Sequence, residues 1–151
     1  MLRSILIGVV AGQRAMTPLA VVAAAAARNR LPGGPLPALA THSAVAPAGI
    51  ALAAAEMAGD KMQTAPDRTV VAGLLARSAT AAISGAALAQ PGRRRIGGLL
   101  AVTAAVATSY AGLALRKRAM RRFGQVRTGF VEDALVLSAG IAIATTGVAE
   151  A

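Results

Sequence analysis

The chain contains no cysteine and no tryptophan, only one tyrosine and two phenylalanines, and only 6 acidic residues against 16 lysines and arginines among 151 residues. Without cysteine there is no disulfide bond and no thiolate metal site. His42 is the only histidine, so a histidine-based zinc site or a Ser-His-Asp triad has little to draw on. We interpret His42 as a polar residue of a loop or helix end, and we expect no metal and no cofactor.

The scarcity of aromatic residues also argues against a soluble core, which normally depends on aromatics for buried area. Hydrophobic residues, mostly alanine, valine, leucine and isoleucine, make up 56% of the chain, charged residues make up 15%, and the mean hydropathy is +0.60. Soluble domains contain roughly 45–50% apolar and about 25% charged residues. Helices in a bilayer can pack through small residues instead. The composition predicts one transmembrane domain over residues 1–151.

Five apolar stretches approach the roughly 20 residues that a membrane-spanning helix needs. They are Leu2–Ala27, Ala38–Ala58, Thr69–Ala89, Ile96–Leu115 and Phe130–Val148. The short connections between them are rich in proline, glycine or charge, so helices should end there and pack together. The fourth stretch has no charge and no polar face, unlike a helix of a soluble bundle. We predict an all-α, polytopic integral membrane bundle with four or five apolar segments.

The first stretch begins like a signal peptide, but it continues past Arg14 to Ala27 and is too long and too interrupted to be cleaved. Arg14 and Pro18 interrupt it, and Arg77 lies near the middle of the third stretch. One or both stretches are therefore expected to be broken or re-entrant, which is tolerated at membrane depth only inside protein or along a cavity. Whether Pro18 and Pro47 break or only kink their helices stays open.

The side of the membrane on which each connection lies is not decided by the sequence. If all five stretches cross, the N-terminus, residues 59–68 and Arg116–Arg127 share one side, which is cytoplasmic by the positive-inside rule. Arg93–Arg95 would then face outward. A re-entrant first or third stretch changes this assignment.

The net charge of +10 is typical either of nucleic-acid binding or of basic membrane loops. The cations cluster between the apolar stretches, at Arg28/Arg30, Arg93–Arg95 and Arg116–Arg127. No nucleic-acid-binding module surrounds them. We therefore expect the lipid bilayer as partner, with anionic headgroups at Arg116–Arg127, and no nucleic acid. A homo-oligomer is compatible with this pattern.

Charges inside the apolar stretches mark the candidate site. A central arginine costs about 2.5–3.5 kcal/mol to insert, so Arg14 and Arg77 must face protein or water. Acids on other stretches are natural partners, because intramembrane charges pair with one another or mark a solute path. The predicted functional polar cluster comprises Arg14, Thr17, Glu56, Asp60, Lys61, Arg77, Glu132 and Asp133.

Two weaker patterns accompany this cluster. Residues 14–17, Arg-Ala-Met-Thr, resemble residues 77–80, Arg-Ser-Ala-Thr, and each group is followed later by a pair of acids. Inverted repeats of this kind build many transporters. Gly8 and Gly12 form a G-x-x-x-G pair, which suits close packing of membrane helices.

Several motifs occur in a fixed order along nearly the whole chain, from about Ile7 to Ile143. They are Gly12-Gln13-Arg14-Ala15-Met16-Thr17-Pro18-Leu19, Glu56-Met57-Ala58-Gly59-Asp60-Lys61, Pro66-Asp67-Arg68-Thr69, Gly73-Leu74-Leu75-Ala76-Arg77, Tyr110-Ala111-Gly112 and Val131-Glu132-Asp133-Ala134. The series resembles a bacterial membrane family named domain of unknown function 4126. The resemblance implies a small multi-pass protein of the bacterial cytoplasmic membrane and implies no activity.

The leading functional hypothesis is a transporter or channel-like protein for a small or lipid-linked solute. Arg14 and Arg77 would supply positive potential, and the acids would pair or relay protons. The alternative is a structural or accessory membrane protein whose intramembrane charges only pack helices. An intramembrane hydrolase is a third class, although no motif identifies it. Transport predicts water-accessible arginines, a structural role predicts dry paired charges, and a hydrolase predicts two carboxylates aimed at one point.

Overall fold

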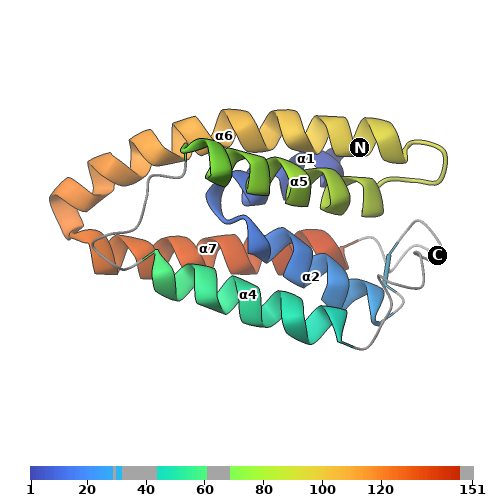
Figure 1. Ribbon diagram of the computed structural model, residues 1–151, viewed down its shortest axis with the longest axis horizontal. Coiled ribbons are helices and arrows are strands. Elements are labelled where there is room, and N and C mark those ends of the chain that lie inside the picture. The colour runs from blue at the N-terminus through green and yellow to red at the C-terminus, as the bar shows by residue number, and fades with distance from the viewer. Residues whose placement is uncertain (29, 32–43, 61–68, 147–151) are drawn as a thin grey trace.

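The structure, a computed structural model, describes residues 1–28, 30–31, 44–60 and 69–146. Within these ranges the chain is all-helical, with six α-helices and no strand. They are α1 (Leu2–Gln13), α2 (Met16–Ala26), α4 (Val45–Gly59), α5 (Val71–Ala87), α6 (Arg94–Phe123) and α7 (Gln125–Thr145). The helices form an elongated bundle in which α6 and α7 are the longest members (Figure 1). The all-α prediction is confirmed.

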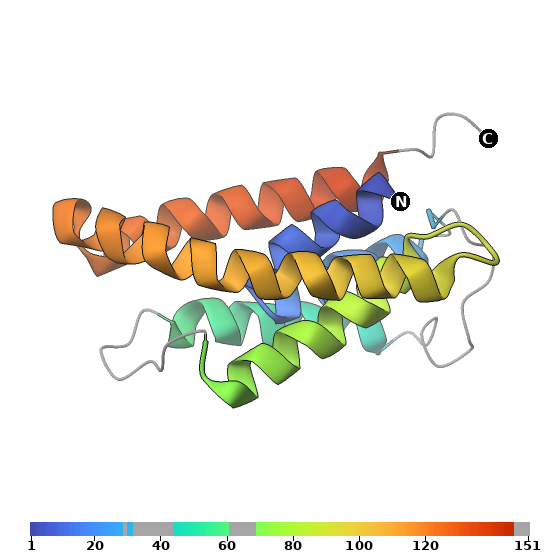
Figure 2. The same ribbon diagram turned by 90° about the horizontal axis from the view of Figure 1, so that it is seen from above.

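The first predicted segment is two short helices and not one continuous helix. Arg14 separates α1 from α2 and has an extended backbone, with φ −139° and ψ 122°. In both ribbon views α1 runs from the N-terminus toward the middle of the bundle, and α2 returns to the end from which α1 started (Figures 1 and 2). Leu2–Ala27 is therefore a helical hairpin, and Arg14–Ala15 form its tip.

The two prolines do not break helices. Pro18 is the third residue of α2, and Pro47 is the third residue of α4. In the first helical turn a backbone N–H has no partner within the helix, so proline is tolerated there. The chain breaks at Arg14 and Ala15, before Pro18 is reached.

The long hairpin of α6 and α7 extends beyond the predicted segments. α6 begins at Arg94 and continues through most of the basic stretch to Phe123, and α7 begins at Gln125. Gly124 joins them with φ +81°, a left-handed conformation that glycine adopts without steric cost. Residues 38–43 of the second predicted segment and 147–148 of the fifth lie outside the described residues.

Small residues make the closest contacts of the core. A Cβ atom built on Gly8 of α1 would lie 2.7 Å from the Cα of Ala101 in α6, and one on Gly12 would lie 2.7 Å from the carbonyl oxygen of Ala105. Gly85 of α5 is equally close to α6, since its Cβ would lie 2.7 Å from the carbonyl oxygen of Gly97. The G-x-x-x-G pair is thus the surface on which α1 packs against α6.

Only two of the described helices have the length and hydropathy of a membrane span. These are α6 and α7, whose most apolar windows have mean hydropathies of 1.7 and 1.4. The apolar helices α1, α2, α4 and α5 have 12, 11, 15 and 17 residues. Helix length therefore does not establish the predicted four or five crossings.

Candidate functional site

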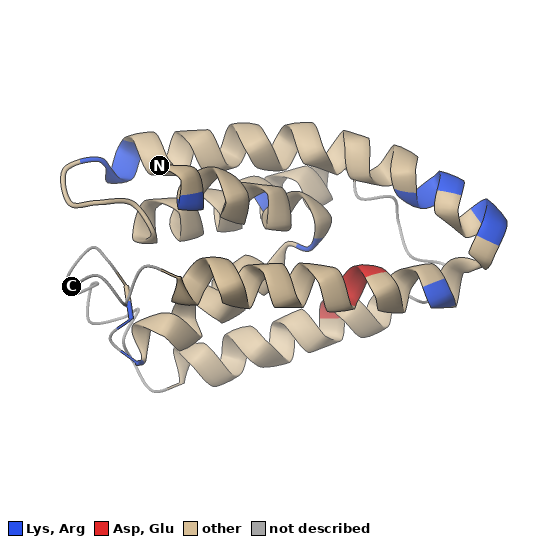
Figure 3. Cartoon of the chain, turned by 180° about the vertical axis from the view of Figure 1, so that it is seen from behind, with Lys and Arg blue, Asp and Glu red and all other residues tan. Residues whose placement is uncertain are grey.

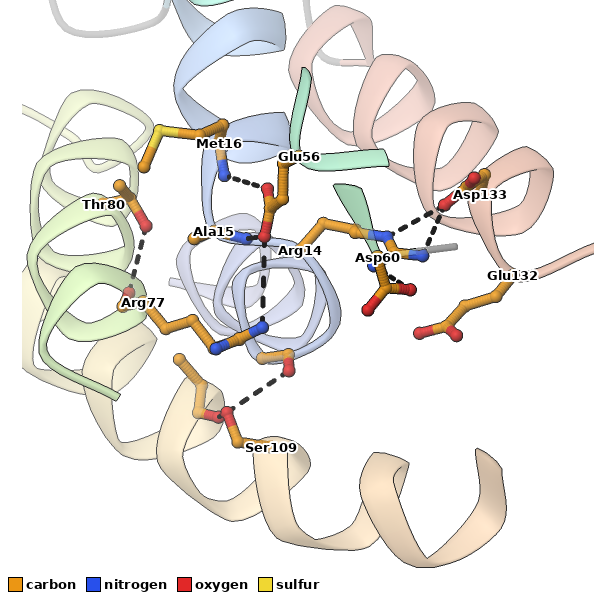
Figure 4. Close-up of polar contacts among 12 residues, drawn as sticks. Arg14, Ala15, Met16, Glu56, Asp60, Arg77, Thr80, Ser109, Glu132 and Asp133 are labelled. Carbon is orange, nitrogen blue, oxygen red and sulfur yellow. Dashed lines mark hydrogen bonds and ion pairs between the residues drawn. The ribbon is translucent and has the colours of Figure 1, made fainter. Parts of the chain in front are cut away.

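Arg14, at the tip of the α1–α2 hairpin, is held by carboxylates from two other helices. It is 1% exposed. Its Nη1 lies 2.7 Å from Oδ2 of Asp60, which follows the last residue of α4, and its Nη2 lies 2.7 Å from Oδ1 of Asp133 in α7. The Nε–H donates to the same oxygen of Asp133 at 2.9 Å (Figure 4). One guanidinium therefore ties the hairpin tip to α4 and α7.

Glu56 of α4 binds the start of α2. The backbone N–H of Ala15 donates to Oε1 at 2.7 Å, and that of Met16 donates to Oε2 at 2.8 Å. These N–H groups have no partner within a helix, and a carboxylate at a helix N-terminus is also favoured by the helix dipole. At the end of α1, the hydroxyl of Ser109 donates to the carbonyl of Gly12 at 3.2 Å. Other helices thus satisfy backbone groups that the break releases, which allows the break to be buried.

Two further arginines extend the cluster. Arg77 of α5 is 8% exposed, and its Nη2 lies 4.0 Å from Oε1 of Glu56. Arg116 of α6 is equally buried; its Nη1 donates to Oε2 of Glu132 at 3.1 Å and pairs with Oδ2 of Asp60. Figure 3 shows all acidic residues of the described chain in one region on α4 and α7, whereas most cations gather toward the two ends of the bundle.

The cluster is close to electrical neutrality. Among the described residues, three guanidinium groups, those of Arg14, Arg77 and Arg116, face four carboxylates, so these seven groups carry one excess negative charge when all are ionised. The N-terminus of α2 contributes roughly half a positive charge beside Glu56. Such balance lowers the cost of keeping seven charged groups away from bulk water.

The structure brings together most of the predicted polar cluster. Six members, Arg14, Glu56, Asp60, Arg77, Glu132 and Asp133, lie in the network just described. Thr17 is fully buried in the first turn of α2, and its hydroxyl has no hydrogen-bond partner within the described chain. Lys61 lies outside the described residues.

Arg116 is the member that the sequence did not single out. We expected it to face lipid headgroups together with the rest of Arg116–Arg127, but its side chain points into the bundle. A pattern in the sequence does mark it. The buried small residues Gly97, Ala101, Ala105 and Ser109 of α6 recur every four residues, and Gly112 and Arg116 continue that stripe on the packed face.

The apparent repeat of Arg14 and Arg77 does not extend to the backbone. Arg14 occupies an extended position between two helices, whereas Arg77 lies inside α5. Both side chains are buried and both face acids. The two arginines therefore share a kind of environment but not a backbone conformation.

Comparison with family models, with curated proteins and with solved structures finds no match to this chain. The resemblance to domain of unknown function 4126 therefore stays a prediction and assigns no role to any residue. Among the residues that the structure describes, no group of three His, Cys, Asp or Glu side chains is arranged to hold a metal ion.

Proposed function

We propose that the chain is a multi-pass membrane protein that passes a small or lipid-linked solute by way of the buried hairpin tip. The membrane location is supported by exposed apolar surface. In the most apolar 18-residue stretch of each helix, only 22% of the stretch in α6 and 33% of that in α7 is buried in the bundle. A core helix of a soluble protein would be mostly buried. Leu99, Leu115 and Leu135 are among the large hydrophobic side chains left exposed. So many exposed large hydrophobic side chains indicate a lipid or protein environment.

In the proposed arrangement α4, α5, α6 and α7 cross the bilayer, and the α1–α2 hairpin enters and leaves on one side. The charge-free part of α6, Ile96–Leu115, measures about 30 Å and equals the hydrocarbon thickness. α1 and α2 are each less than about 20 Å long, so they reach only part of the way across. The basic stretches Arg93–Arg95 and Lys117–Arg127 then lie at opposite faces.

One observation carries the transport proposal: the broken helix places Arg14 between Asp60 and Asp133 deep in the bundle. Discontinuous helices in transporters form solute and ion sites, because the break leaves backbone groups and a helix N-terminus free to bind. Here the N-terminus of α2 and the Arg14 guanidinium are positive, and carboxylates now occupy both. An anionic solute group would replace a carboxylate at one of these positions.

A structural or accessory role is the second candidate, and it is favoured because Arg14 is buried away from water and fully paired. Arg14 is 1% exposed and paired on both of its terminal nitrogens. Buried ion pairs of this kind can act solely to fix the register in which helices pack. An intramembrane hydrolase has less support, because Asp60 and Asp133 converge on a guanidinium and not on an open position.

Cysteine accessibility separates the two candidates, since the chain has no native cysteine. Single cysteines replace Ala15 or Thr17 at the tip, Leu75 on the exposed face of α5, and Arg118 in the basic part of α6. Intact cells and opened membranes are then treated with a membrane-impermeant thiol reagent.

Arg118→Cys should react when its side of the membrane is exposed, and Leu75→Cys should not. Transport predicts that Ala15→Cys and Thr17→Cys react, because a water-filled path reaches the tip. Complete protection of both, in folded and expressed protein, would reject transport in favour of the structural role.

A further inference from the structure

A groove runs beside the hairpin tip between the two longest helices. α6 and α7 diverge from their junction at Gly124 (Figure 1) and leave a groove of about 800 Å³. Its walls include Leu115 and Phe123 of α6 and Val131 and Leu135 of α7, all of which are exposed. The volume falls within the roughly 300–1,000 Å³ of typical ligand sites.

The groove is apolar along its length and charged toward one end. Arg116 and Glu132 both line it, and they neutralise each other through their 3.1 Å hydrogen bond. Arg127 also lines the groove, is exposed, and forms no ion pair with any described acid. Beyond Arg116, residues 117–127 contain five cations and no acid, so the charged end of the groove is electropositive.

The position of the groove along the bundle matches an amphiphile. The apolar portion of the groove is lined by Ala111, Gly112 and Leu115, which end the charge-free part of α6. The charged portion of the groove is lined by Arg116 and Arg127. If Ile96–Leu115 spans the hydrocarbon, the transition falls at the boundary between acyl chains and headgroups. Apolar walls at acyl depth and an unneutralised guanidinium at headgroup depth are complementary to a lipid with an anionic headgroup.

We propose that this groove binds a phospholipid with an anionic headgroup, with an acyl chain along Leu115 and Leu135 and the headgroup phosphate at Arg127. The inference rests on the proposed membrane location and deepens it by naming the lipid class. Because Gln13 also lines the groove, the bound lipid lies next to the residue that precedes Arg14.

The absence of native tryptophan allows a direct test. The full-length chain carrying Leu135→Trp is reconstituted in vesicles with brominated phosphatidylglycerol or brominated phosphatidylcholine, each at the same fraction. Bromine quenches tryptophan fluorescence only on contact. The matched reporter is Leu75→Trp, because Leu75 is similarly exposed but lies on α5 and does not line the groove.

We expect the anionic lipid to quench Leu135→Trp more strongly than the zwitterionic lipid does, and both lipids to quench Leu75→Trp equally. In the Leu135→Trp background, Arg127→Gln should lower the preference about fivefold, as expected for loss of one basic contact at the membrane surface. Arg118→Gln removes the same charge from a residue that does not line the groove, and it should leave the preference within about a factor of two.

Two different failures are distinguishable. Equal quenching of Leu135→Trp by the two lipids would overturn the anionic-lipid site and leave the membrane location standing. Absence of quenching at both tryptophans with either lipid would overturn the membrane location, and the lipid site with it.

Discussion

Among the helical hairpins of the described chain, α1–α2 and α6–α7 both have arginine at or near the tip. In α1–α2 the tip is buried and Arg14 contacts Asp60 and Asp133. In α6–α7 the tip is exposed, and Arg121 and Arg122 contact no acid of the described chain. All four described acids serve the buried arginines or the start of α2. Acidic residues are thus placed where a cation is removed from water and nowhere else in the described chain.

The largest effect should come from removing the buried cation. Arg14→Ala leaves Asp60 and Asp133 facing each other without their shared partner, and breaking a buried ion pair costs about 3–5 kcal/mol. We expect a loss of that size in the free energy of unfolding, measured by denaturant or thermal unfolding of the purified chain in detergent.

The matched change at the exposed tip is Arg121→Ala, which removes the same charge from a side chain in solvent. It should change the free energy of unfolding by no more than about 0.5 kcal/mol. Similar effects of the two substitutions would remove the distinction drawn between the hairpins.

A smaller effect should follow from filling the contact that holds the buried hairpin against α6. Gly12→Ala places a methyl group 2.7 Å from the carbonyl oxygen of Ala105, so the helices must separate. Overpacking of this kind costs about 1–3 kcal/mol. Gly59→Ala is the control, because a Cβ there meets no atom within 4 Å. A loss of stability in the control equal to that of Gly12→Ala would argue against close packing as the cause.

The smallest effect should come from the carboxylate that caps α2, because its 4.0 Å contact with Arg77 is the longest of the ion pairs described above. Glu56→Gln keeps one oxygen to accept from Ala15 or Met16 but loses the negative charge at the helix N-terminus, and Glu56→Ala loses both oxygens. Cap removal costs about 0.5–2 kcal/mol, so Glu56→Ala should be the more destabilising in thermal unfolding. If Glu56→Gln were as harmful as Glu56→Ala, charge and not hydrogen bonding would dominate the cap.

The sequence predicted where the helices lie better than how they connect in space. Long apolar runs and the proline- and glycine-rich connections are local signals, and they located most of α4, α5, α6 and α7. The break at Arg14 was foreseen only as one option, because an arginine in an apolar run is compatible with a straight helix if partners surround it. Those partners come from α4 and α7, and no local rule places them.

The candidate site shows the same division. Arg14, Arg77 and the acids were identified from the sequence alone, because the free-energy cost of a charge in an apolar run must be compensated by a partner or by water. Arg116 was assigned to the basic stretch because it begins the run of cations from Arg116 to Arg127. Only the position of Arg116 on the stripe of small residues sets it apart from the neighbouring cations. That stripe indicates a packed face only once α1 and α5 are known to lie against it.

The contact between Arg14 and Asp133 also sets an order of events in biosynthesis, because the two residues are 119 positions apart. At translation rates of about 5–20 residues per second, the ribosome reaches Asp133 roughly 6–24 s after Arg14. Throughout that interval the hairpin tip lacks a carboxylate on which its native position depends. The hairpin tip is therefore completed only after α7 has been made, and a nascent chain truncated before α7 should carry an incompletely neutralised Arg14.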